Sequence, residues 1–162
     1  MKKWLMSMIM LILVFSLMPI MASAQPAPPL TDLQFVGITS DGDDYEWYDV
    51  PNNQTNIDYT ASGSEVVVAI YVEGTTRGSS PWMRSRGENI HPQTYEPFPR
   101  RYLSGPDRII YGHIRYVAMP IEAVADNETG TSGMITAQAM DYYGPLTYLY
   151  AHLNFHIDPR EK

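Results

Sequence analysis

The chain of 162 residues contains no cysteine. This absence excludes disulfide bonds, zinc sites built on thiolates and cysteine nucleophiles. If the protein works outside the cytoplasm, its hydrophobic core must hold it together without cross-links. Lysine is also scarce, because only Lys162 follows Lys2 and Lys3. This distribution argues against serine chemistry that depends on a neighbouring lysine.

Short motifs of several enzyme classes are absent as well. The sequence has no G-x-S-x-G nucleophile elbow, no H-E-x-x-H zinc motif and no glycine-rich phosphate loop. The sequence does not exclude a pair of carboxylates for glycoside cleavage, since 18 acidic residues offer many pairs and only geometry selects one. The sequence therefore predicts that the protein is not an enzyme and holds no cofactor. A small secreted hydrolase is the alternative.

Residues 1–24 have the order of a secretory signal peptide. A cationic start, an apolar run over residues 4–18 and a small-residue site precede Gln25. This order predicts cleavage between Ala24 and Gln25. The alternative is an uncleaved membrane anchor, but the apolar run is shorter than the roughly 20 residues that span a bilayer. We expect a secreted or periplasmic protein with no membrane span after cleavage.

The rest of the chain is predicted to be a short tether, residues 25–31, and one domain, residues 32–158. This length suffices for one domain with a core but not for two. Loss of Lys2 and Lys3 leaves nine basic residues against 18 acidic ones, a formal charge of about −9. An exported domain this acidic is a poor candidate for binding nucleic acid.

Charge is unevenly distributed along the mature chain. Residues 25–76 contain nine acidic residues and no basic one, whereas seven arginines lie in residues 77–115. Either the two regions lie together and neutralise each other, or the arginines bind an anionic partner. An acidic glycan or a protein carboxylate would suit them, because the planar guanidinium makes bidentate hydrogen bonds.

Hydrophobic patterns predict strands and no helix. Residues 148–157 alternate between apolar and polar side chains, the period of a half-buried strand. Residues 65–73 are β-branched and apolar on both faces, as in a central strand. Residues 109–121 are a third clear strand. Its even positions are expected to face the core, namely Ile110, Ile114, Tyr116 and Ala118.

Weaker patterns predict further strands at residues 33–38, 45–50, 57–60 and 134–140. Gly37 is expected to mark a β-bulge in the first of them. Six to eight short strands with turn signals predict an all-β, antiparallel β-sandwich. Residues 74–107 are the exception, because they carry five prolines and no clean period. They are either one long loop rich in proline, arginine and aromatic residues, or a region of short edge strands.

The final hairpin resembles a known class of module. The residues Ala139-Met140-Asp141-Tyr142-Tyr143-Gly144 are followed by the long alternating strand. This arrangement resembles the closing hairpin of secreted immunoglobulin-like and fibronectin type III-like modules. The resemblance implies an immunoglobulin-like sandwich with an adhesive or accessory role, and it carries over no functional residue.

Exposed aromatic rings stack on sugar faces or anchor protein contacts, and residues 74–107 are rich in them. We predict a ligand site there, made of aromatic and arginine side chains: Trp82, Arg84, Arg86, Tyr95, Phe98, Arg100, Arg101 and Tyr102. The sequence thus favours an exported, non-catalytic module that binds a protein or cell-surface component. A carbohydrate-binding module that uses the same aromatic residues is the alternative.

Metal sites are not predicted, and calcium is the one alternative. His152 and His156 are four residues apart, which in a strand separates them by about 13 Å at roughly 3.3 Å per residue. The possible calcium ligands are Asp41, Asp43, Asp44 and Glu46. They do not follow the EF-hand spacing, and a solvated turn is the simpler explanation. Asn53 and Asn127 begin glycosylation sequons on predicted surface turns.

Overall fold

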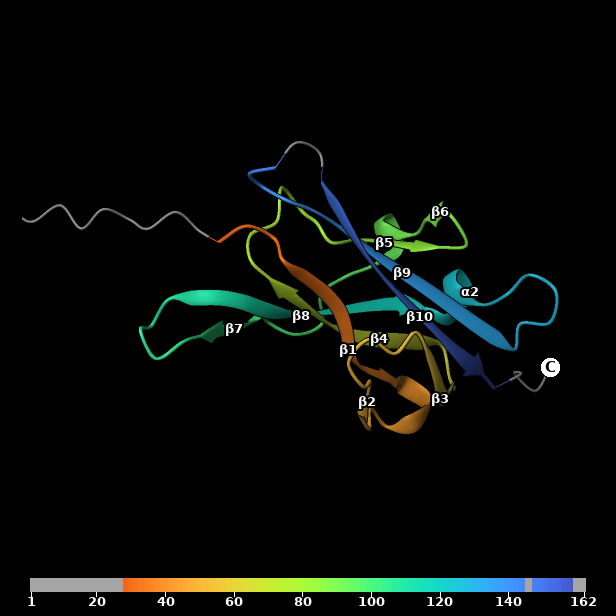
Figure 1. Ribbon diagram of the computed structural model, residues 1–162. Coiled ribbons are helices and arrows are strands. Elements are labelled where there is room, and N and C mark those ends of the chain that lie inside the picture. The colour runs from red at the N-terminus through yellow and green to blue at the C-terminus, as the bar shows by residue number, and fades with distance from the viewer. Residues whose placement is uncertain (1–27, 145–146, 159–162) are drawn as a thin grey trace, which may run out of the picture.

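Two five-stranded β-sheets pack face to face in the computed structural model, which describes residues 28–144 and 147–158 (Figure 1). The strands are β1 (Asp32–Ser40), β2 (Tyr48–Asp49), β3 (Asn56–Ala61), β4 (Glu65–Glu73), β5 (Trp82–Ser85), β6 (Glu88–Asn89), β7 (Arg101–Ser104), β8 (Ile110–Pro120), β9 (Ser132–Met140) and β10 (Tyr148–Ile157). The short helices are η1 (Asp41–Asp43), η2 (His91–Gln93) and α2 (Ile121–Val124). The predicted all-β sandwich is confirmed.

Sheet A has the strand order β2-β1-β4-β8-β7, and sheet B has the order β3-β10-β9-β5-β6. Neighbouring strands are antiparallel, except that β10 and β3 run parallel. The register of β1 against β4 shifts between Phe35 and Gly37, which confirms the predicted bulge. The hairpin of β7 and β8 projects beyond the rest of the sandwich (Figure 1).

The predicted signal peptide and its cleavage site at Ala24 and Gln25 lie outside the described residues. The described part of the predicted tether, residues 28–31, lies along the sandwich. The Thr31 N–H donates to the carbonyl of Glu73 at 2.9 Å, and the Thr75 N–H donates to the carbonyl of Pro28 at 2.9 Å. Within residues 28–144 and 147–158, no helix is long and apolar enough to cross a bilayer.

The core lies between the sheets because both sheets direct alternate apolar side chains toward it. The central strand of sheet A contributes Val66, Val68, Ile70 and Val72, and β10 contributes Ala151, Leu153, Phe155 and Ile157. On the other face of β10, Tyr150, His152 and His156 are exposed. The period-two pattern of residues 148–157 therefore predicts both faces of this strand correctly.

Strand β8 faces the core with its odd positions, so the predicted even positions are wrong. Val117 and Met119 belong to the core, and Arg115 lies on the same face. Ala118 on the outer face is also fully buried. Because this part of β8 is covered on both faces, hydrophobicity alone could not distinguish its inner side.

Residues 74–107 contain β5, β6 and β7, so the alternative of short edge strands is correct. Strand β5 pairs with β9 in sheet B, and β7 pairs with β8 in sheet A. Proline lacks the N–H needed for a β-ladder, which keeps these strands short. The segment passes from the edge of sheet B to the edge of sheet A and closes one side of the sandwich.

Candidate functional site

The eight residues of the predicted ligand site do not form one surface. Trp82 and Arg84 lie on β5 and Arg86 in the turn after it, all in sheet B. The guanidinium of Arg86 donates to the carbonyl oxygens of Ala125 and Ser132, the latter at 3.0 Å. These three side chains belong to the edge of sheet B.

Tyr95 fastens the following segment to sheet A. Its main chain exchanges two hydrogen bonds with Ala118, and its hydroxyl donates to Oε2 of Glu65 at 2.6 Å. The hydrogen bond with Glu65 is the main cause, and burial the second, that raises the pKa of Tyr95 to about 12. The remaining predicted residues follow together at the start of β7: Phe98, Arg100, Arg101 and Tyr102.

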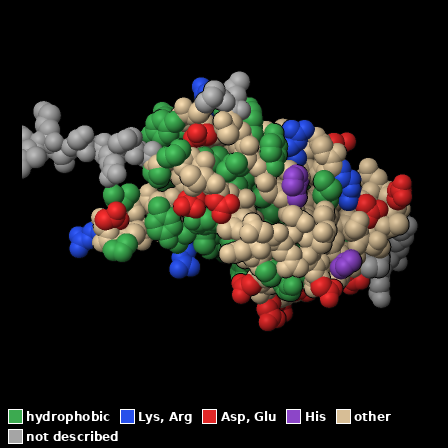
Figure 2. Space-filling model, in the orientation of Figure 1, with side chains coloured by type: hydrophobic (Ala, Val, Ile, Leu, Met, Phe, Trp, Pro, Cys, Tyr) green, Lys and Arg blue, Asp and Glu red, His purple; other side chains and the backbone are tan. Residues whose placement is uncertain are grey.

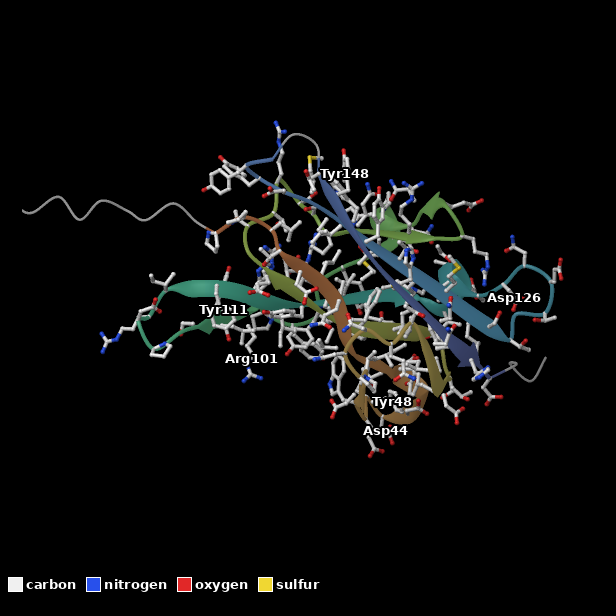
Figure 3. All side chains as sticks on the ribbon, viewed as in Figure 1. Asp44, Tyr48, Arg101, Tyr111, Asp126 and Tyr148 are labelled. Atoms are coloured by element: carbon white, nitrogen blue, oxygen red, sulfur yellow. The ribbon has the colours of Figure 1, made fainter. Side chains whose placement is uncertain are left out.

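Strand alternation places Arg101 and Tyr102 on opposite faces of sheet A. Arg101 is opposite Ile114 and Tyr102 is opposite His113, and opposite residues of antiparallel strands share a face. Tyr102 therefore lies on the inner face and Arg101 on the outer face. Figure 3 shows Arg101 extending away from β7, on the side opposite to sheet B. A hollow lies on each side of this segment.

The first hollow, named here the aromatic cleft, lies on the outer face of sheet A. It has a volume of about 510 Å³ and is lined by Trp47, Phe98, Pro99, Arg100, Arg101 and Tyr116. The rings of Trp47 and Phe98 meet Tyr116 edge to face, with centroid distances of 5.7 and 5.6 Å. Trp47 is 39% exposed and Phe98 43%. The three rings form a wall with arginines beside it.

Small residues on sheet A make room for the ring of Trp47. Gly37 of β1 is opposite Ala69 of β4, which is opposite Tyr116 of β8. A Cβ atom at Gly37 would lie only 3.1 Å from the Trp47 ring, so the glycine makes room for the indole. The sequence signal at Gly37 indicated a bulge, but nothing local indicated the ring above it. Trp47 and Tyr116 were therefore missed as site residues.

The second hollow, named here the hairpin pocket, has a volume of about 840 Å³. Its walls come from residues 28–29, residues 74–78 and the hairpin of β7 and β8. Tyr102, Ile110 and Tyr111 of this hairpin are exposed. Figure 2 shows hydrophobic side chains both on the projecting hairpin and on the end of the sandwich beside it. The pocket therefore combines apolar walls with the polar side chains of Arg100, Asp107 and His113.

An ionic cluster lies between the two hollows. Glu96 accepts hydrogen bonds from Nε and Nη2 of Arg100 at 3.2 and 3.0 Å. Its Oε1 also lies 2.7 Å from Nε of Arg115, an ion pair in which the N–H does not point at the oxygen. Nη1 of the buried Arg115 donates to the carbonyls of Ser79 and Pro81 at 2.9 and 3.3 Å. Arg100 lines both hollows.

The site is cationic although the protein is acidic. The hydrogen bond from Arg100, with the charge of Arg115, lowers the pKa of Glu96 and keeps its carboxylate ionised at neutral pH. Arg100 and Arg115 share the one carboxylate of Glu96, and Arg101 lines the aromatic cleft beside Arg100, in a chain of formal charge −7. Within the described ranges 28–144 and 147–158, no hydrogen bond or ion pair engages the Arg101 guanidinium.

Among the described residues, no arginine forms an ion pair with an acidic residue of the first half of the domain. Both ion pairs among the described residues involve Glu96, which lies in the arginine-rich region itself. The alternative in which the two charged regions neutralise each other stays a prediction. Figure 2 shows acidic side chains gathered instead over the end of the molecule formed by η1, β2 and β3.

The family model described as a domain of unknown function, DUF4879, matches residues 25–155. The chain belongs to the DUF4879 family. A search of curated proteins found no match to the chain. Both hollows and the ionic cluster lie within the matched residues, so they are part of the DUF4879 domain itself.

Two histidines of the DUF4879 domain lie beside the ionic cluster. Nδ1 of His91 and Nε2 of His113 are buried and have no hydrogen-bond partner among the described residues. Burial lowers the pKa of both rings. The charges of Arg100 and Arg115 lower the pKa of His113 further, while Glu96 opposes them. The fold therefore favours the neutral form of both imidazoles.

We expect the DUF4879 domain to lose thermal stability between about pH 7.5 and about pH 5.5, because an unfolded histidine ionises near pH 6.5. The folded-state pKa values are lower, so in this range the unfolded chain binds more protons. The stability contributed by the neutral rings is complete well above pH 6.5, falls progressively as the unfolded histidines ionise, and is fully lost once the pH has fallen through the folded pKa. Scanning calorimetry at a series of pH values measures this fall in Tm. The variant H91Q/H113Q should show a smaller fall in Tm, and an equal fall would contradict the assignment.

The acidic turn of the DUF4879 domain is largely exposed, as expected of a solvated turn, and two of its aspartates also hydrogen-bond to neighbouring segments. Oδ1 of Asp41 accepts the N–H groups of Ser64 and Glu65 at 2.8 Å, and Asp43 accepts the hydroxyl of Tyr59 at 2.8 Å. Although burial opposes them, these hydrogen bonds lower the pKa of both aspartates. Within the described residues, no group of three His, Asp or Glu side chains could hold a metal ion. The calcium alternative for Asp41, Asp43, Asp44 and Glu46 stays a prediction.

Proposed function

We propose that this protein is an exported, non-catalytic binding module whose ligand binds around residues 98–102. The observation that carries the proposal is the position of exposed Phe98, Arg101 and Tyr102 beside two hollows. Concave sites lined by aromatic side chains and a few polar groups are the common form of ligand sites. A protein or cell-surface component outside the cytoplasm is the proposed partner.

The carboxylates Asp107, which lines the hairpin pocket, and Glu96, in the ionic cluster beside the hollows, support binding rather than catalysis. Glu96 is held by Arg100 and Arg115, and Asp107 accepts the N–H of Ile109 at 3.1 Å. Both side chains stabilise local structure, and an ionised, doubly paired Glu96 is a poor general acid. A hydrolase that uses these carboxylates would first have to release them from these contacts.

Export is supported by the leader pattern of residues 1–24, and the family match begins directly after it. The intact mass of the secreted product tests the export proposal, because it should correspond to a chain that starts at Gln25.

We also infer an immunoglobulin-like organisation from the closing hairpin. In the hairpin turn, Oδ1 of Asp141 accepts the N–H groups of Tyr143 and Leu30, both at 3.2 Å.

Phe98→Ala and Tyr111→Ala should each weaken retention of the secreted product on an array of extracellular glycans and proteins. Each substitution removes a partly exposed ring from one hollow, and truncating such an anchor typically weakens binding by roughly tenfold. Tyr142→Ala, which removes an exposed ring from the turn between β9 and β10, is the matched control. Dissociation constants of the wild type and the three variants are compared for each retained component.

Several outcomes of this experiment would change the proposal. If both variants keep full affinity for every component, the ligand binds elsewhere on the protein. Retention by polysaccharides alone would favour the carbohydrate-binding alternative. Release of cleaved products from a retained glycan would favour the secreted hydrolase instead.

A further inference from the structure

We propose that the aromatic cleft binds a uronate ring of an acidic polysaccharide, with the carboxylate of the sugar on Arg101. The inference rests on the proposed function, because it names the class of ligand for one half of the same site. Two features of the cleft carry it, namely the arrangement of its aromatic rings and its unpaired cationic charge.

The aromatic wall suits a sugar ring. A pyranose has a face of C–H groups, which packs on the surface of an aromatic side chain. Trp47 and Phe98 meet Tyr116 at interplanar angles of 65° and 85°, so the three rings do not lie in one plane, and together they line the cleft. The side chain of an aspartate or glutamate has only a short methylene stem. A carboxylate carried on a ring therefore uses this wall better than an acidic protein segment does.

The charge of the cleft favours an acidic sugar over a neutral one. Arg101 is exposed at the cleft, and no described residue pairs with its guanidinium. The planar guanidinium binds a carboxylate through two parallel hydrogen bonds. Arg100 adds a second positive charge from the same wall, and its Glu96 partner is shared with Arg115. The acidic remainder of the protein would repel a polyanion, which limits the contact to this region.

The test measures binding of the secreted full-chain product to polygalacturonate, alginate and hyaluronate. Methyl-esterified polygalacturonate is the matched ligand, because it keeps the sugar ring and loses the charge. We expect at least one acidic polymer to bind. If polygalacturonate binds, its affinity should be roughly tenfold or more higher than that of its methyl ester, because a charged hydrogen bond usually contributes about that much to affinity. Arg101→Gln should lose most of this affinity. Arg77→Gln, at an exposed arginine of the loop between β4 and β5, should retain it.

Tryptophan fluorescence locates the binding. In a Trp82→Phe background, Trp47 is the sole tryptophan of the chain after Gln25. An acidic polymer that enters the cleft should change the emission of this protein, and the change should be lost with Arg101→Gln. Because the Arg101 side chain makes no hydrogen bond or ion pair with the described residues, Tm of this variant should equal that of the wild type.

The outcomes separate this inference from the proposed function. Equal binding of acidic and esterified polymer, or unchanged affinity of Arg101→Gln, overturns the uronate assignment and leaves the binding module in place. If none of the acidic polymers binds, and retention on a protein is lost with Phe98→Ala, the uronate assignment is overturned in favour of a protein ligand. If no glycan and no protein is retained at all, the proposed function itself is wrong.

Discussion

Glu96→Ala should lower the free energy of unfolding by about 3 kcal/mol, near the lower end of the range for removing one partner of a buried ion pair. The substitution leaves the guanidinium of Arg115 without its carboxylate, in a position where its side chain is only 7% exposed. Arg100 then faces Arg115 as a second unpaired cation. The lower end of the range applies because the Glu96 side chain itself is 30% exposed, so water screens part of the interaction.

Urea unfolding of Glu96→Ala and Arg100→Ala separates the buried pair from the exposed one. Arg100→Ala keeps the pair between Glu96 and Arg115 and removes only an exposed contact, since the Arg100 side chain is 39% exposed. Exposed pairs contribute about 1 kcal/mol or less. If both variants lose the same stability, the ion pair with Glu96 does not stabilise buried Arg115. The segment that contains Glu96, between β6 and β7, must then be held by other contacts.

Leu153→Ala should cost about 3–5 kcal/mol, the range for removing a leucine side chain from a packed core. Leu153 is fully buried at the middle of β10; it is opposite Ile135 of β9, and the next residue, Asn154, is opposite Asn56 of β3. Because the ladders on both sides restrain the backbone, the structure cannot easily collapse into the cavity. The midpoint and the slope of urea unfolding measure the loss.

Tyr150→Ala is the matched control for this prediction, because Tyr150 lies on the same strand with its ring 53% exposed on the outer face. Substitutions at such positions change stability by about 0.5 kcal/mol or less. A loss as large as that of Leu153→Ala would mean that the outer face of sheet B is covered in solution. Self-association of the protein would then be the first explanation to examine.

The strands that the sequence predicts most reliably have two faces in different surroundings. In β10, Leu153 and Phe155 face the core while His152 and His156 face water, so the period of two is visible in the sequence. In β8 the same argument selects the wrong face. Both faces are buried near Ala118, and the core side also carries Arg115, which is tolerated there because it pairs with Glu96 and donates to two carbonyl oxygens.

The candidate site was found only in part, because it joins separate regions of the chain. Phe98, Arg100, Arg101 and Tyr102 are close in sequence, and composition alone singles them out. Trp47 and Tyr116 complete the aromatic cleft from other strands and loops. The residues Trp82, Arg84 and Arg86 were grouped with them by sequence distance, but β5 places them in the other sheet.

The sequence by itself determined that this protein is an all-β domain with a leader pattern, a β-bulge at Gly37 and a long regular closing strand. These features depend on interactions between residues a few positions apart, which a local pattern records. Only the tertiary structure decided which face of β8 is buried and which residues surround the aromatic cleft. The ion pair of Glu96 with Arg115 and the contact of Trp47 with Tyr116 join distant residues, so they exist only when the sheets have formed.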